Sequence, residues 1–171
     1  EEVKPDYQCD LRHLAFPDEF ASFIYSSHVL EHFGRWEVND VLKEWIRVLK
    51  PEGKVELVVP NLLWAVKKIA ENGEVPDYDS MNVLYGAQEE HGYDRKFNTH
   101  YCGFTPKLLI ALVEEYGLEV TSCEDFISNP DLEYNIVLKA VKVKKVEDQI
   151  EDKNRYLLEE DVELSESLCL V

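Results

Sequence analysis

The chain has 171 residues and is 45% hydrophobic, which is enough for one globular domain with a core of its own. Its formal net charge of -17 argues against nucleic acid or an anionic membrane surface as a partner, because both attract an excess of Lys and Arg. No stretch approaches the roughly 20 consecutive apolar residues that a membrane-spanning helix requires.

The ends and the cysteines of the chain give further expectations. The four cysteines show no CxxC spacing, so the sequence supports neither a disulfide framework nor a zinc knuckle. Reduced thiols are typical of a cytoplasmic protein, and we expect that location. The chain begins at Glu1 without Met and without the regions of a signal peptide, so we expect a fragment or a processed chain.

Short apolar runs alternate with segments of helical periodicity. In chain order they predict a strand at 7–10, a strand at 20–26, a helix at 38–49, a turn at 51–53, a strand at 55–59, a helix at 62–72, an irregular loop at 74–103, a helix at 106–116, and strands at 120–126 and 134–143. A loop as long as 74–103 is usually functional, and its His, Tyr and Asp residues suggest either a lid or an ordinary loop pinned by aromatic side chains.

This alternation predicts an α/β domain over residues 1–145. We expect a partial doubly wound, mainly parallel sheet with helices on both faces and an antiparallel hairpin formed by the last two strands. Residues 146–171 are strongly acidic, and we expect a tail that is disordered or forms a short docked helix.

Two segments carry a resemblance to a known family. CDLRHLAFPDEFASFIYSSHVLEHF, from Cys9, and VLKEWIRVLKPEGKVELVVPNL, from Val41, resemble the second half of class I (Rossmann-like) S-adenosylmethionine-dependent methyltransferases. The likeness is strongest to the type 11 group and extends over about residues 3–143. Its pieces are an acidic residue at Asp10, a "lPFpd"-like stretch, an "HvLEH" motif at 28–32 and a turn similar to "LKPGG".

The resemblance implies where the cofactor and the acceptor would lie. Asp10, or the adjacent backbone at Leu11, would accept the adenine amine, and Ser26 and Ser27 would close a strand beside the methyl group. His28 is the first candidate for a general base, and His91 in the long loop is the second. Turn formation by Asp10 and tight packing by the two serines are the structural alternatives.

The chain also departs from the family pattern. It has no glycine-rich loop after a first strand and no acidic residue for the ribose hydroxyls, so we expect this chain alone to bind S-adenosylmethionine weakly or not at all. A sheet that lacks its first strands exposes an edge, and such edges recruit partners. We therefore expect a homo-oligomer or a partner chain that covers the open edge.

The segment from His28 to His32 also fits the H-x-x-E-H pattern of inverted zinc peptidases. That chemistry needs both histidines on one helical face, whereas here the motif directly follows a buried strand. We therefore expect no metal site.

The leading functional hypothesis is transfer of a methyl group from S-adenosylmethionine to a small-molecule or glycan-type acceptor. Such catalysis depends mainly on alignment, so the acceptor cannot be read from a catalytic dyad. The alternative is a non-catalytic binding or interaction module that retains a truncated methyltransferase fold.

Overall fold

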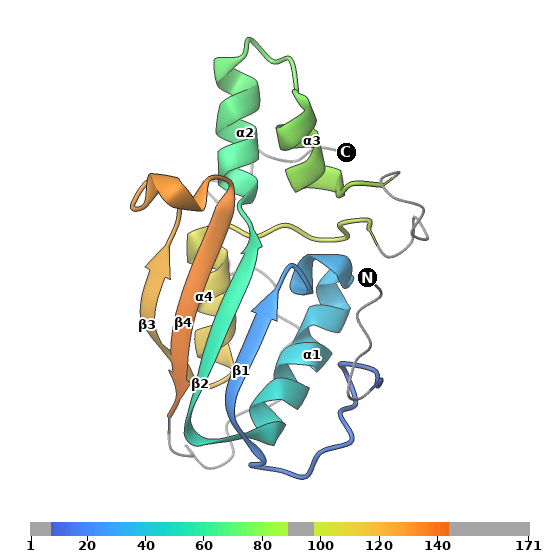
Figure 1. Cartoon of the computed structure of the whole chain (residues 1–171), viewed down its shortest axis with the longest axis vertical. Helices are drawn as coiled ribbons and strands as arrows, with labels where there is room; N and C mark the ends of the chain where they lie inside the picture. The colour runs from blue at the N-terminus through green and yellow to red at the C-terminus, as the bar shows by residue number, and fades with distance from the viewer. Residues whose placement is uncertain (1–7, 89–97, 144–171) are drawn as a thin grey trace.

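A four-stranded sheet with the order β1-β2-β4-β3 forms the centre of the fold (Figure 1). The computed structural model describes residues 8–88 and 98–143. The strands are β1 (Ala21–Ser27), β2 (Leu49–Pro60), β3 (Leu118–Glu124) and β4 (Asn135–Lys142). β1 and β2 are parallel, whereas β4 is antiparallel to both β2 and β3. The predicted α/β class is thereby confirmed, including the antiparallel C-terminal hairpin.

Four α-helices accompany the sheet in this part of the chain: α1 (Arg35–Val48), α2 (Leu62–Glu71), α3 (Tyr78–Tyr85) and α4 (Pro106–Glu115). Short 3-10 helices are η1 (Leu30–His32) and η4 (Pro130–Leu132). None of the described helices has the length and apolarity that crossing a membrane would require. The helices expected at 38–49, 62–72 and 106–116 are confirmed by α1, α2 and α4.

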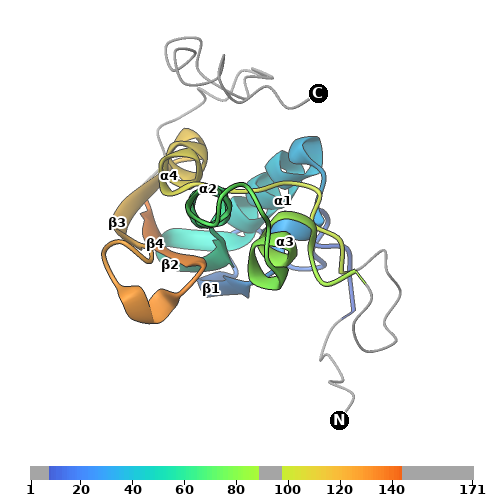
Figure 2. The same ribbon diagram turned by 90° about the horizontal axis from the view of Figure 1, so that it is seen from above.

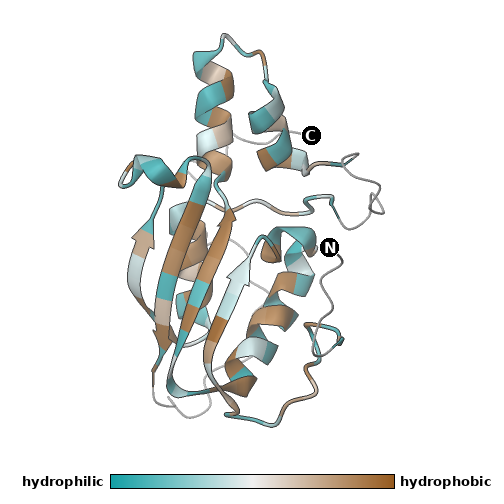
Figure 3. Cartoon of the chain, viewed as in Figure 1, coloured by the Kyte–Doolittle hydropathy of each residue, from teal (hydrophilic) through white to brown (hydrophobic). Residues whose placement is uncertain are grey.

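The core lies between one face of the sheet and the helices α1 and α4, which share that face (Figure 2). Apolar and polar residues alternate along β2 and β4 (Figure 3), as they do in strands with one buried face. The alternating buried residues of these two strands include Val55, Leu57, Val59, Ile136, Leu138 and Ala140. They meet apolar side chains of the two helices, namely Val38, Val41, Leu42, Trp45, Leu109, Leu112 and Val113.

The opposite face of the sheet is more polar and more exposed. Glu56 of β2 and Lys139 of β4 are paired in register and form an ion pair of 3.7 Å. Tyr25 of β1 lies in register with Glu56, and Phe23 lies two residues before it, so both aromatic side chains project from this face. Their exposed fractions are 59% and 53%. Helices were expected on both faces, but among the described residues helix packing is concentrated on one, because the other face carries polar side chains such as Glu56 and Lys139.

The structure differs from the expected elements at three places. Residues 8–10 form no strand, because the Asp10 carboxylate accepts the backbone N–H of Arg12 at 2.9 Å and holds a turn. The loop expected at 74–103 contains α3, whose N-cap Asp77 and third residue Ser80 form a capping box. The tail at 146–171 lies outside the described residues.

The third difference concerns the turn after α1. Ala21 is paired with Leu49 and Phe23 with Lys54, so β2 already pairs with β1 before the turn, and the residues between Leu49 and Lys54 bulge out. Glu52 in this bulge has a φ of 63°. The turn is present as expected, but it interrupts a strand instead of preceding one.

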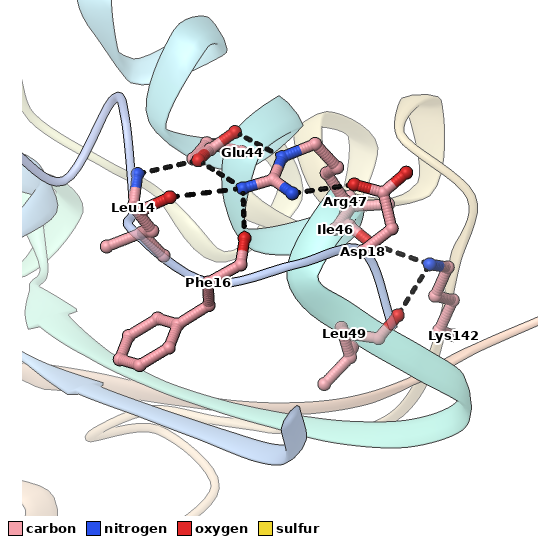
Figure 4. A network of polar contacts seen from close by, with 8 residues as sticks. All are labelled: Leu14, Phe16, Asp18, Glu44, Ile46, Arg47, Leu49 and Lys142. Carbon is pink, nitrogen blue, oxygen red and sulfur yellow. Dashed lines mark hydrogen bonds and ion pairs between the residues drawn. The ribbon is translucent and has the colours of Figure 1, made fainter. Parts of the chain in front are cut away.

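Two basic side chains fasten α1 to its neighbours (Figure 4). Arg47, in the last turn of α1, donates to the carboxylate of Asp18 at 2.6 Å and so holds the segment that enters β1. Lys142, at the end of β4, donates to the carbonyl oxygens of Ile46 and Leu49, both at 2.6 Å. These carbonyls belong to the C-terminal end of α1, where a cation is favourable. Both contacts lie where β1 begins, because Leu49 is paired with Ala21, so they fix the end of the sheet opposite the carboxyl ends of β1 and β2.

Candidate functional site

The carboxyl ends of the parallel strands β1 and β2 form the edge where ligands bind in open α/β sheets. A cleft of about 270 Å³ lies at this edge, and its lining includes His28, Pro60, Asn82, His100 and Tyr134. These residues follow β1, end β2, belong to α3, precede α4 and precede β4, so five separate segments meet there. Figure 1 shows the segment that leads into α4 crossing beyond the ends of these strands.

His28 connects β1 to η1 in a strained conformation. Its φ of 53° lies in the left-handed region, which is uncommon for a residue with a Cβ. Its backbone N–H still donates to the carbonyl of Val58 at 2.9 Å, so the ladder between β1 and β2 continues to this point. The side chain is 42% exposed and its Nδ1 lies 3.2 Å from Oε1 of Glu31. The structure therefore places His28 in the cleft, and its catalytic role stays a prediction.

Glu31 is a buried acid beneath His28. Its side chain is 1% exposed, and neither carboxylate oxygen accepts a hydrogen bond within the described chain. The contact with His28 is at ion-pair distance but lacks hydrogen-bond alignment. The backbone carbonyl of Glu31, in contrast, accepts the N–H of Tyr101 at 2.8 Å and so ties η1 to the segment before α4. A buried carboxylate without partners is unfavourable, and such groups need an explanation.

Two histidine rings lie next to this acid, with centroids 5.0 Å apart and an interplanar angle of 70°. Nδ1 of His32 is 3.0 Å from the carbonyl oxygen of Thr99, and Nδ1 of His100 is 3.0 Å from that of Val83. Burial lowers the pKa of His100 below its usual value of 6.5, so its imidazole is neutral near neutral pH. One ligand atom each from Glu31, His32 and His100 lie within 4.8 Å of one another.

The two residues expected to contact the adenine, Asp10 and Leu11, differ in their exposure to solvent. Asp10 is exposed, and hydrogen bonds from Arg12 lower its pKa to about 2. Arg12 also contacts Glu37 in the first turn of α1, so Asp10 lies near the end of α1 that follows the site. Leu11 is half-buried and packs against the core.

The two serines point to opposite faces of the sheet. Ser26 is paired in register with the buried Leu57, so its side chain faces the core, and it is buried. Ser27 is half-buried on the other face. The second candidate base, His91, lies outside the described residues.

Glu31, His32 and His100 were not recognised as a group from the sequence. The motif 28–32 drew attention only as a match to two family patterns, and His100 was assigned to a long loop. The available signal was the capping box at Asp77, which predicts α3 and therefore a fixed support for the segment that follows.

Comparisons with known proteins agree with this architecture. A SAM-dependent methyltransferase from Methanosarcina mazei superposes with a TM-score of 0.56 at 20% identity, covering 80% of this chain and 66% of that one. A Burkholderia thailandensis 1,6-didemethyltoxoflavin-N1-methyltransferase, crystallised with its substrate and S-adenosylhomocysteine, gives 0.51 at 14%, with coverages of 80% and 49%. The Haloferax volcanii complex of the Trm112 activator with a methyltransferase gives 0.51 at 12%, with coverages of 83% and 65%.

The chain thus spans between about half and two thirds of the length of these three structures. No curated protein sequence matches it. At the level of sequence families, however, a methyltransferase domain matches residues 2–123, a range that includes the turn at Asp10, the motif at 28–32 and the segment before α4. Because this match covers well over half of the 171 residues, the chain belongs to the methyltransferase domain family.

Proposed function

We propose that the chain takes part in the transfer of a methyl group from S-adenosylmethionine to a small-molecule or glycan-type acceptor. The observation that carries the proposal is the family match over residues 2–123, which includes Asp10, His28 and the group of Glu31, His32 and His100. The similar Burkholderia enzyme was crystallised with S-adenosylhomocysteine, which is the demethylated form of the same cofactor.

The residues present fit one part of the cofactor. Asp10 offers an exposed carboxylate that is charged at neutral pH and can accept a hydrogen bond from the adenine amine. The adjacent backbone at Leu11 is the alternative acceptor for that amine, and Ser27 lies at the end of β1. Ser26 contributes by its small size alone, since its side chain is buried in the core face. When bound, S-adenosylmethionine supplies an electrophilic methyl group.

The residues of the chain supply alignment and a base. His28 lines the cleft, and when Nδ1 carries a proton toward Glu31, Nε2 is left to accept a proton from the acceptor. Deprotonation is needed only for acceptors that lose a proton during transfer.

A cofactor titration beside a methyl-transfer assay tests this assignment in the full-length protein. Asp10→Ala should weaken cofactor binding about ten- to a hundredfold, because a hydrogen bond to a charged acceptor is lost. His28→Ala should leave cofactor affinity unchanged and slow transfer. Asp131→Ala, which removes a carboxylate at an exposed position outside the lining of the cleft, is the matched control for Asp10→Ala.

The outcome distinguishes the two hypotheses. Cofactor binding and transfer that respond to these variants support an enzyme, whereas a full-length protein without either activity would favour the interaction module. For the 171-residue chain alone we expect weak or no binding in calorimetry, since residues for the ribose and the methionine are missing from it. Tight stoichiometric binding by this chain would contradict that expectation.

We further propose that the open edge of β1 pairs with a second copy of the chain or with a partner chain. One edge of β1 is bonded to β2, and the other has no strand beside it among the described residues. The exposed aromatic side chains of Phe23 and Tyr25 add apolar surface next to that edge. The Haloferax methyltransferase complex with Trm112 is an example of a similar fold that binds another chain.

The thiols of Cys9, Cys102 and Cys123 are free, which favours the cytoplasm as the location of the protein.

A further inference from the structure

We propose that Glu31, His32 and His100 bind one divalent transition-metal ion at the carboxyl end of β1. Each residue offers one ligand atom, and the three atoms lie within 4.8 Å of one another. Ligands of a common ion at 2.0–2.2 Å are separated by roughly 3–4 Å, so only small side-chain movements are needed to close the site.

The strongest observation is the state of the Glu31 carboxylate. Only 1% of its surface is exposed, and both oxygens lack hydrogen-bond donors within the described chain. His28 approaches one oxygen at 3.2 Å without hydrogen-bond alignment, which leaves the second oxygen with no polar partner. Buried charges are normally paired or coordinate metals. A cation beside Glu31 would therefore satisfy a group that the described protein leaves unsatisfied.

The hydrogen bonds of the two histidines leave the opposite ring nitrogens available as ligands. A carbonyl oxygen can only accept, so Nδ1 of His32 must donate to Thr99 and Nδ1 of His100 must donate to Val83. In a neutral imidazole, Nε2 then carries a lone pair and no proton. Histidines that bind metals are oriented in this way by a backbone carbonyl on the other nitrogen.

The donor set also indicates the class of ion. Two imidazole nitrogens and one carboxylate oxygen suit Zn²⁺, Co²⁺, Ni²⁺ or Fe²⁺, whereas Ca²⁺ and Mg²⁺ prefer oxygen ligands throughout. Three protein ligands leave coordination positions open, and His100 lies on the wall of the cleft. An open position facing a cleft is the arrangement of ligand-binding metal sites rather than of closed structural ones.

This site differs from the inverted zinc peptidase pattern. In that pattern His28 and His32 would both be ligands, but His28 has a left-handed backbone ahead of η1 and is outside the group of three. His100, from the segment before α4, takes the third position. The expectation that the chain has no metal site rested on the cysteine spacing and on the motif, neither of which includes His100.

Metal titration of the purified 171-residue chain tests the proposal without cofactor or acceptor. After treatment with a chelator, the chain should bind one Zn²⁺ in calorimetry, and Co²⁺ should give an absorption spectrum typical of bound metal. Glu31→Gln and His100→Asn should each weaken Zn²⁺ binding about a hundredfold or more, since even the loss of an outer partner costs 10–100-fold. In His100→Asn the amide nitrogen replaces Nδ1, so the bond to Val83 is retained while the ligand is lost.

Two controls separate this site from the alternatives. His13→Ala removes an exposed imidazole outside the site and should leave Zn²⁺ affinity unchanged. His28→Ala should also retain stoichiometric binding, and if it abolished binding while His100→Asn did not, the H-x-x-E-H pattern would replace our assignment. Absence of stoichiometric binding by the native chain, or equal affinity in Glu31→Gln and native chain, would overturn the proposal. Circular dichroism of each metal-free variant verifies that lost binding does not reflect lost folding.

Discussion

Gly86 is the residue at which a single methyl group should disturb the site most. It ends α3 with φ and ψ of 76° and 169°, a region that essentially only glycine adopts. A Cβ built there would lie 1.9 Å from the carbonyl oxygen of Asn98 and 3.1 Å from Cδ2 of His100. The first contact is with backbone, so the chain on either side must move.

The expected loss has two parts. The backbone region costs a residue with a Cβ about 1–3 kcal/mol, and overpacking against fixed atoms costs about 1–3 kcal/mol more. Gly86→Ala should therefore lower the free energy of unfolding by roughly 2–6 kcal/mol. Gly73→Ala is the matched control, because Gly73 also has a positive φ, of 71°, but a Cβ there meets nothing within 4 Å. Its loss should be about 1–2 kcal/mol, from the left-handed backbone alone.

Urea denaturation followed by circular dichroism measures both losses under the same conditions. The ring signals of His100 in NMR spectra provide a second readout, since they should shift in Gly86→Ala and stay unchanged in Gly73→Ala. Equal losses of stability in the two variants would refute the reasoning, because it would mean that the close approach between α3 and residue 98 is absent in solution.

Two other predictions concern the turn at Asp10 and the edge at β1. Arg12→Ala should raise the pKa of Asp10 from about 2 toward 3.8 in an NMR titration, and an unchanged pKa would contradict the turn. Because the pKa is lower in the folded state than in the unfolded state, the stabilisation by this pair is present above pH 3.8 and is lost as the pH falls toward 2. Replacing Phe23 and Tyr25 by Ser should shift sedimentation toward the monomer, whereas Tyr78→Ser, at an exposed aromatic of α3, should not. A native chain that sediments as a clean monomer with an ordered sheet would count against the proposed pairing.

The fold was largely predictable because its elements follow local rules. The apolar positions of 38–49 recur at helical spacing and Thr105 with Pro106 opens α4, and both helices form where expected. The prediction of a strand at 7–10 was wrong for residues 8–10, because the Asp10 side chain accepts the backbone N–H of Arg12 and so favours a turn over an extended chain. The pairing of Leu49 with Ala21, before the turn at Glu52, was not predicted, because it depends on where β1 lies and the sequence around the turn does not give that position.

The site was only partly predictable, because its geometry joins residues far apart in the chain. His28 and Ser27 were placed correctly at the end of a strand, since the strand itself was recognised. The group around Glu31 depends on His100, whose position is set by a hydrogen bond to α3, and α3 was predicted as a loop. A motif of five residues therefore allowed two opposed interpretations until the partner of Glu31 was placed.

Several unfavourable features are concentrated at one edge of an otherwise well-packed sheet. His28 adopts a left-handed backbone, Glu31 is a buried carboxylate without hydrogen-bond donors in the described chain, and Gly86 leaves no room for a side chain. Each costs stability and persists only where surrounding structure holds it, here by the backbone bond from Tyr101 to Glu31 and the bond from His100 to Val83 of α3. A ligand that binds only the folded chain offsets such costs by mass action. The location of the unfavourable features therefore supports the proposed site at this edge, independently of the family to which the chain belongs.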